Sequence, residues 1–302
     1  MLRAVTFLLL CLSLLQSAWS VTSVVTSTPD LRSLVEAVGG DRVTVASLVP
    51  NAGDAESYAP RPQDVARLRG ARLVVRVGLD YDLWLDRLLR QSGDAALQRG
   101  ASGYLDSSTG ITLLEVKTGG LSGGGHAHGA GNPHYWLDPQ NAHIITGGIA
   151  EALARLDPAS AKYYEQRRAD FLSRLDKRVL VWQEKLAPMS GQPLMMYHNS
   201  WPYFARRFRL NFIGVIEPRP GVGPSPSAME KLLTSMNREK VKVVVREPQE
   251  PSRDVDFLAR KSGANVAVLA ASVGDLAQAN DYLSLFEINV TALLAAFNGN
   301  SR

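Results

Sequence analysis

Cysteine is almost missing from this chain of 302 residues, and its single cysteine, Cys11, lies within the first twenty. Residues 1–20, MLRAVTFLLLCLSLLQSAWS, combine a basic start, an apolar core too short to span a bilayer and a small-residue end. This pattern is typical of a secretory signal peptide cleaved near Ser20, with an uncleaved membrane anchor as the alternative. The mature chain would then lack cysteine, which excludes disulfides and thiolate metal sites, so His, Asp or Glu must hold any metal.

Long apolar runs and clustered basic charge are also lacking. Beyond the first twenty residues no stretch approaches the roughly 20 apolar residues of a membrane-spanning helix, so we expect no transmembrane segment in the mature chain. The formal net charge is +4, and the arginines are scattered along the sequence, which disfavours a nucleic-acid-binding surface. With 45% hydrophobic and 21% charged residues, the composition is that of a globular protein of one or two domains.

Alternating strand and helix patterns predict a first α/β lobe over residues 21–156. The β-branched segment VTSVVTS is followed by Thr28 as a helix N-cap, Pro29 in the first turn and a helix that ends at Gly39-Gly40. The segments RVTVASLV and LVVRVG predict two further strands, with the short helix RPQDVARLRG before the second. Such alternation is typical of a parallel sheet covered by helices on both faces.

A long helix is predicted over residues 157–187, with Asp157 as its N-cap and Pro158 in its first turn. Apolar residues recur at spacings of three and four, which predicts an amphipathic helix about 45 Å long. The segment PMSGQP ends it. We interpret this helix as the link between two lobes.

A second α/β lobe is predicted over residues 188–302. The strands PLMMYH, LNFIGVI, VKVVVREP and NVAVLAAS alternate with helices, one of them with a predicted capping box from Ser227 to Glu230. The predicted fold class is therefore α/β, with two lobes, each a mostly parallel sheet flanked by helices, joined by one long helix. Ligands of such open sheets bind beyond the carboxyl ends of the strands and between lobes.

Four side chains that can bind metal follow predicted strands or precede a predicted helix. His198 ends PLMMYH, Glu247 ends VKVVVREP, and Glu56 follows RVTVASLVP. His134 lies in NPHYWLDP, before a helix predicted to begin near Pro139. Singly, such a histidine is more often hydrogen-bonded or exposed, and such a glutamate solvated or paired with Arg. Together, facing one cleft, they predict a metal site between the lobes.

Several segments in series resemble the metal-binding solute-binding proteins of bacterial ABC importers, the TroA-like zinc and manganese class that includes ZnuA. The segment NPHYWLDP is similar to the family's Asp-Pro-His-x-Trp-x-Asp-Pro pattern, and MMYHNSWPYFARRF to its His-x-x-x-x-Tyr-Phe segment. VVVREPQ, DYLSLFEINVTALLAAF and the opening STPDLRSLVEAVGG also match, so the resemblance covers nearly the whole mature chain. It implies a monomer in the periplasm that binds one divalent ion between two lobes and delivers it to an ABC transporter permease.

The resemblance implies that His134 and His198 are metal ligands. At the family's first histidine position this chain has Glu56, within DAESYAP, where Ala55 and Ala59 replace a proline and a glutamate. Glu56 is therefore the third expected ligand.

The family's fourth ligand, an aspartate in a turn near the last helix, falls on Ala271 in AASVGD. Asp275, four residues later, is the expected replacement, with Glu247 or a water molecule as the alternatives.

Two imidazoles and one carboxylate suit zinc (Zn2+), with a water or a second carboxylate as the fourth ligand. The exchange of an imidazole for a carboxylate moves the preference toward Mn2+ or Fe2+, which are the alternatives. In the glycine-rich loop 119–131, His126 and His128 are interpreted as an auxiliary metal-capture site, and a plain flexible loop is the other interpretation.

Two other classes of function remain to be weighed. Two histidines and a glutamate with an open position are also the ligands of zinc hydrolases. The sequence has neither an HExxH nor a GxSxG motif, and no evident general base, so we expect no enzyme. The third hypothesis is a non-transport protein in which the metal site has weakened.

Overall fold

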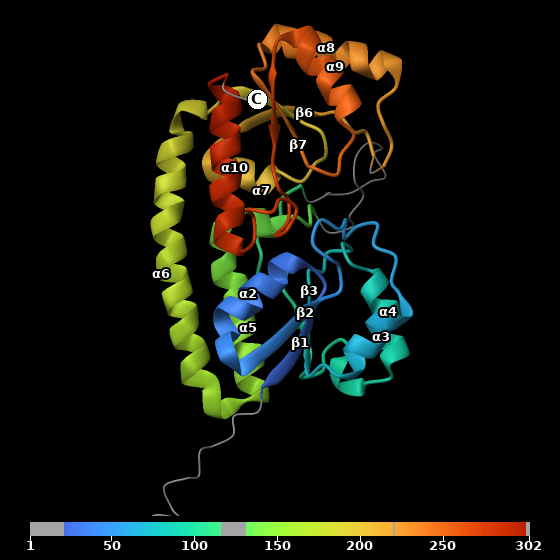
Figure 1. Cartoon of the computed structure of the whole chain (residues 1–302), viewed down its shortest axis with the longest axis vertical. Coiled ribbons are helices and arrows are strands. Elements are labelled where there is room, and N and C mark those ends of the chain that lie inside the picture. Colours follow the sequence, from blue (N-terminus) through green and yellow to red (C-terminus); the bar gives the residue numbers. More distant parts are fainter. Residues whose placement is uncertain (1–20, 116–130, 220, 300–302) are drawn as a thin grey trace, which may run out of the picture.

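The computed structural model describes residues 21–115, 131–219 and 221–299, which form two α/β lobes beside one long helix (Figure 1). The predicted signal peptide, residues 1–20, lies outside the described residues, as do His126 and His128. In the described part of the chain, no helix is both long enough and apolar enough to cross a membrane.

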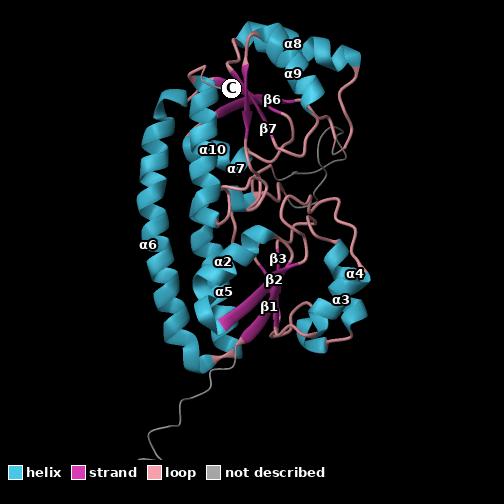
Figure 2. Cartoon of the chain, viewed as in Figure 1, coloured by secondary structure: helices cyan, strands magenta, loops and turns pink. Residues whose placement is uncertain are grey.

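The first lobe contains a four-stranded sheet in which every neighbouring pair is parallel. In spatial order its strands are β2 (Val43–Ser47), β1 (Thr22–Thr26), β3 (Leu73–Arg76) and β4 (Tyr104–Asp106). Its helices are α2 (Pro29–Gly39), α3 (Pro62–Arg69), α4 (Trp84–Ser92) and α5 (Ala142–Leu156). Val24 packs into the core that includes α2 and α5, whereas Val25 packs with α3 and α4, so both faces are covered (Figure 2).

The second lobe repeats this plan. Its parallel strands, in spatial order, are β6 (Asn211–Val215), β5 (Pro193–Met196), β7 (Val243–Arg246) and β8 (Asn265–Val268). Its helices are α7 (Pro202–Phe208), α8 (Pro226–Glu239), α9 (Ser252–Ser262) and α10 (Tyr282–Phe297). When the strands are numbered within their own lobe, both sheets have the order 2-1-3-4. Successive strands are therefore added first on one side of the initial strand and then on the other, and the switch lies between β1 and β3 and between β5 and β7. The predicted fold class is confirmed.

Helix α6 (Ala161–Leu186) runs along both lobes and is about 39 Å long. It packs on α2 and α5 of the first lobe and on α10 of the second. As predicted, Asp157 occupies the N-cap position and Pro158 the first turn, but this turn, Pro158–Ser160, is a 3-10 turn, so the α-helix itself begins at Ala161. The Asp157 carboxylate also accepts the Tyr164 hydroxyl. The domain boundaries at residues 156 and 187 stay predictions.

Two helix starts show which side chains cap. Thr28 caps α2 as predicted, since its Oγ1 accepts from the Leu31 amide. The predicted capping box at Ser227 is wrong, because Pro226 occupies the first turn of α8 and Ser225 accepts the Ala228 amide instead, at 3.2 Å. Two elements, α4 and β4, were not predicted at all.

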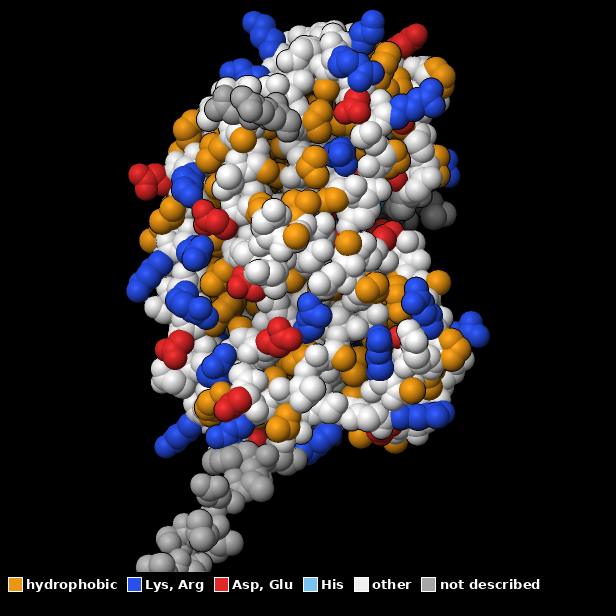
Figure 3. Space-filling view, in the orientation of Figure 1, with side chains coloured by type: hydrophobic (Ala, Val, Ile, Leu, Met, Phe, Trp, Pro, Cys, Tyr) orange, Lys and Arg blue, Asp and Glu red, His pale blue; other side chains and the backbone are white. Residues whose placement is uncertain are grey.

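Buried polar contacts join the lobes behind the cleft. Asp30, at the start of α2, accepts the Ser272 hydroxyl at 2.5 Å and the Val273 amide at 2.9 Å. Asp138 is fully buried and accepts two hydrogen bonds from the Arg207 guanidinium of α7, at 2.6 and 3.1 Å. On the outer surface in view, by contrast, acidic and basic side chains are interspersed (Figure 3), as the scattered arginines of the sequence suggested.

Candidate metal centre

Glu56, His134 and His198 come together in the cleft between the lobes. One donor atom from each lies within 4.8 Å of the others. Glu56 Oε1 is 3.4 Å from His134 Nε2 and 3.8 Å from His198 Nε2. A tetrahedral zinc ion with ordinary bond lengths places neighbouring donors about 3.4 Å apart. The three side chains are therefore spaced to bind one ion.

Both lobes contribute to this group. Glu56 lies in the loop between β2 and α3, and His134 directly precedes the 3-10 turn Tyr135–Leu137 that leads toward α5. His198 lies two residues beyond the end of β5 in the second lobe. An ion bound here would bridge the lobes.

His134 is buried, and its neighbours set its tautomer. Its Nδ1 lies 3.1 Å from the Asn132 Oδ1 atom, which also accepts the His134 amide at 3.0 Å. Asn132 is oriented by donating from Nδ2 to Glu115 Oε2 and to the Asn199 carbonyl. An amide oxygen can only accept, so Nδ1 carries a proton and Nε2 is the ring nitrogen left to bind a metal.

His198 has a charged partner instead. Its Nδ1 lies 2.6 Å from Glu217 Oε2, and Glu217 is buried, with 7% of its surface exposed. Burial lowers the pKa of His198, but its hydrogen bonds to Glu217 and Glu56 outweigh burial and raise that pKa to about 11. A metal ion must therefore displace a proton from His198. Glu217 was not predicted, although it follows strand β6 just as Glu247 follows β7.

Asp275 and Glu247 line the same cavity but lie outside the group of three. Asp275 accepts Gln249 Nε2 and the Ser272 amide, both at 2.8 Å. Glu247 Oε1 accepts the Ser200 hydroxyl at 2.6 Å. Neither carboxylate has an atom in the group of three, so the predicted fourth ligand stays a prediction.

The cavity favours cations. It has a volume of about 440 Å³, and its charged lining consists of carboxylates and His198, without Lys or Arg. Burial raises the pKa of Glu247 to about 7 and that of Glu250 to about 9, because ionised carboxylates are poorly solvated there and repel one another. A divalent cation relieves this repulsion, and an anion would increase it. The carboxylates of the lining are Asp54, Glu56, Glu217, Glu247, Glu250 and Asp275.

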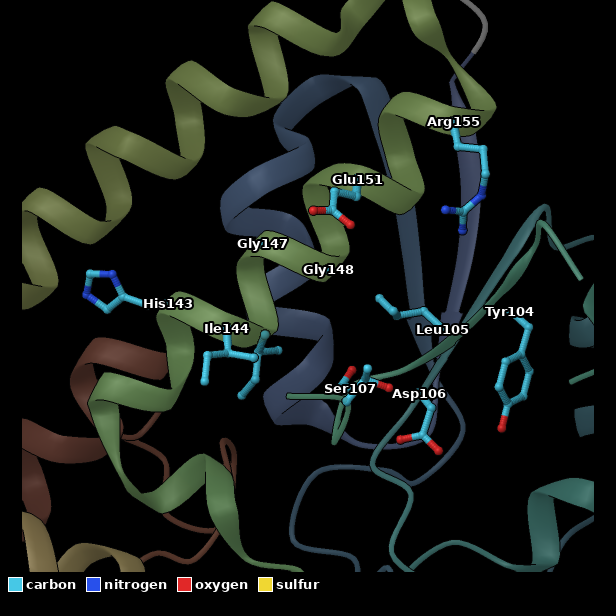
Figure 4. Close-up of a pocket in the computed structure, with 12 residues that line it drawn as sticks. Tyr104, Leu105, Asp106, Ser107, His143, Ile144, Gly147, Gly148, Glu151 and Arg155 are labelled. Carbon is cyan, nitrogen blue, oxygen red and sulfur yellow. The ribbon is translucent and has the colours of Figure 1, made fainter. Parts of the chain in front are cut away.

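A second cavity, of about 530 Å³, lies between β4 and α5 and shares no lining residue with the first (Figure 4). Its one histidine, His143, has Nε2 2.8 Å from the Asp176 carboxylate of α6. Among the described residues, Glu56, His134 and His198 form the one group of three or more side chains close enough to hold a metal. The second cavity is therefore no competing metal centre.

Known proteins share this sequence pattern and fold. The family model described as "Zinc-uptake complex component A periplasmic" (ZnuA) matches residues 24–296. The high-affinity zinc uptake system protein ZnuA of Bacillus subtilis (strain 168) is 24% identical over 279 residues, which cover 89% of this chain and 86% of that protein. A putative metal-binding protein of Treponema pallidum (strain Nichols) is 25% identical over 244 residues, covering 79% and 76%. A crystal structure of a ZnuA deletion mutant with zinc bound is 29% identical, with a TM-score of 0.77, and covers 94% of this chain and 99% of that one.

Proposed function

Since the chain belongs to the ZnuA family of periplasmic zinc-uptake components, we propose that it captures one divalent metal ion between its lobes and delivers it to an ABC permease. The observation that carries this proposal is the cluster of Glu56, His134 and His198, with donor separations of 3.4 and 3.8 Å. The periplasmic location accords with the signal peptide predicted in residues 1–20.

Zinc is the cargo that this donor set suits best. Zinc accepts two imidazoles and a carboxylate and tolerates water in a fourth position, whereas Mn2+ and Fe2+ favour more oxygen donors. The carboxylates around the cleft keep Mn2+ and Fe2+ as the alternatives. Asp275 is the proposed fourth ligand, with Glu247 or a water molecule as the alternatives. His126 and His128 remain proposed as an auxiliary capture site.

The test is a metal titration of the chain from residue 21, purified without a tag and stripped with a chelator. Zinc, manganese and ferrous iron are added separately, with the melting temperature as the readout. An ion that binds only the folded state stabilises it by about 2.7 kcal/mol at a hundredfold excess over its Kd. We expect a rise with zinc that is absent from Glu56→Ala, His134→Ala and His198→Ala.

The matched control is His143→Ala, because this histidine lies on α5 and pairs with Asp176 rather than with the cluster. It should retain the full rise with zinc. A wild-type protein that responds to none of the three metals would refute the proposal.

One observation favours a second candidate, a zinc hydrolase. Glu247 lines the cavity beside the cluster and has a pKa of about 7, as a general base requires. The zinc-loaded protein should nevertheless show no turnover of ester and peptide substrates. Turnover abolished by Glu247→Gln would replace the transport proposal with the hydrolase.

A further inference from the structure

The two imidazoles of the cluster are held by different acceptors. His134 is bonded to a neutral amide oxygen and His198 to a carboxylate. We propose that Glu217 is a positioning residue that aims His198 Nε2 at the metal and strengthens it as a donor. This inference rests on the proposed function, because it concerns the same ion.

Glu217 is rigidly placed relative to His198. It follows β6, whose partner β5 leads to His198, and the backbone pairing of these strands continues past their ends. There the Ile216 amide donates to Met196, and the Glu217 amide donates to the Tyr197 carbonyl at 2.9 Å. The two side chains are thus carried side by side on one sheet.

Both oxygens of the Glu217 carboxylate are used. Oε1 accepts the Gly221 amide at 2.7 Å, and Oε2 lies 2.6 Å from His198 Nδ1. Because the carboxylate is held from the other side by a backbone N–H, it cannot turn away from the imidazole. Glu217 therefore fixes both the ring orientation and the tautomer of His198.

The charge of Glu217 adds a second effect. A carboxylate that accepts the Nδ1 proton raises the basicity of the ring and so strengthens the metal bond at Nε2. Removal of such a partner typically lowers metal affinity 10–100-fold. The neutral Asn132 oxygen, at 3.1 Å from His134, orients its ring without supplying charge. His198 is therefore the stronger imidazole donor of the two.

The test compares Glu217→Gln with Glu217→Ala. The Gln oxygen can still accept the Nδ1 proton, but the side chain carries no charge and its NH2 group cannot accept the Gly221 amide; Ala removes the Nδ1 acceptor as well. Affinity for Zn2+ alone is measured by chelator competition, and the melting temperature of each metal-free variant confirms folding. We expect affinity to fall in the order wild type, Gln, Ala, with a total loss of 10–100-fold.

A spectroscopic readout separates positioning from a structural role. In the zinc-loaded wild type, the Nδ1 proton of His198 should give a strongly downfield proton resonance, because it lies in a short hydrogen bond to a carboxylate. The resonance should weaken in Glu217→Gln and vanish in Glu217→Ala. Asp176→Asn is the matched control: it removes a carboxylate bonded to a histidine, His143, outside the metal cavity, so affinity should change less than threefold.

A Glu217→Ala protein that keeps its zinc affinity within threefold, or loses no more than Asp176→Asn does, would overturn the inference while leaving the proposed function intact. Failure of the wild type to bind zinc would instead overturn the proposed function, and the inference with it. If the Ala variant does not fold, the comparison of Glu217→Gln with Asp176→Asn decides by the same criteria.

Discussion

Replacement of Asp30 by asparagine is expected to remove a pH dependence of the free energy of unfolding that arises at the contact between the lobes. Asp30 is fully buried at the start of α2 and accepts hydrogen bonds from Ser272 and Val273 of the second lobe. Among the described residues no Lys, Arg or His forms an ion pair with it. Its negative charge is therefore stabilised by hydrogen bonds alone.

The magnitude follows from the pKa of Asp30. Burial raises this pKa from its usual 3.8 to about 7, although the bonds to Ser272 and Val273 oppose the rise. Between these two values the folded chain binds a proton that the unfolded chain has lost. The free energy of unfolding therefore falls as the pH rises from about 4 to about 7. A difference of about 3 pH units corresponds to about 4 kcal/mol, fully present below pH 4 and lost above pH 7.

The assay is urea unfolding of metal-free Asp30→Asn and wild type at pH 5, 7 and 8.5. The asparagine oxygen can still accept the Val273 amide, and its Nδ2 can donate to the Ser272 hydroxyl, so the contact persists without a charge. We expect wild type to lose stability relative to the variant as the pH rises, by up to a few kcal/mol. Asp170→Asn, an exposed change on α6, should track wild type at every pH. A constant difference between Asp30→Asn and wild type across the three pH values would refute the reasoning.

Three further changes have defined outcomes. Asp138→Ala leaves two α7 arginines without their buried partner and should lower the free energy of unfolding by about 3–5 kcal/mol in urea; a loss below 1 kcal/mol would contradict this. Ala271→Asp adds a carboxylate to the cavity lining and should raise zinc affinity at least tenfold in chelator competition, whereas an unchanged affinity would show that the new side chain cannot reach the ion. Leu175→Ala, in the buried face of α6, should lower the free energy of unfolding by about 2–5 kcal/mol in thermal unfolding. The exposed Leu180→Ala on the same helix should lower it by about 0.5 kcal/mol or less. Equal losses would contradict the packing of that helix.

The alternation of elements could be predicted because buried parallel strands and amphipathic helices leave strong periodic signals. The strand β4 could not, since its three residues YLD carry no such period. The sequence predicted Asp157 and Pro158 at the start of the long helix, but it could not show that this first turn is 3-10 or that the Asp157 carboxylate also meets Tyr164, because both depend on folded geometry. Local sequence shows which side chains can cap, and tertiary contacts decide which of them do.

The candidate site also combines features that the sequence predicts with features that depend on tertiary contacts. The chain was expected to bring Glu56, His134 and His198 into one cleft, and the structure places their donor atoms together. The position of Asp275 was harder to foresee, because its loop is held by Asp30, more than 240 residues away in the sequence. Glu217 follows β6 as Glu247 follows β7, so the strand-end criterion that selected Glu247 could also have selected Glu217, which lies against His198.

The repeated strand order explains why donors from distant segments meet. Every loop that lines the cleft from the second lobe follows the carboxyl end of one of its four strands, and the first lobe contributes segments that follow β2, β3 and β4. The two sheets thus face each other across the cleft, and polar residues at the strand ends converge on it. Because Asp30 and Asp138 already join the lobes by buried bonds, an ion bound in the cleft would add one more bridge to an existing interface. Metal binding should therefore raise the free energy of unfolding and leave the arrangement of the two lobes largely unchanged.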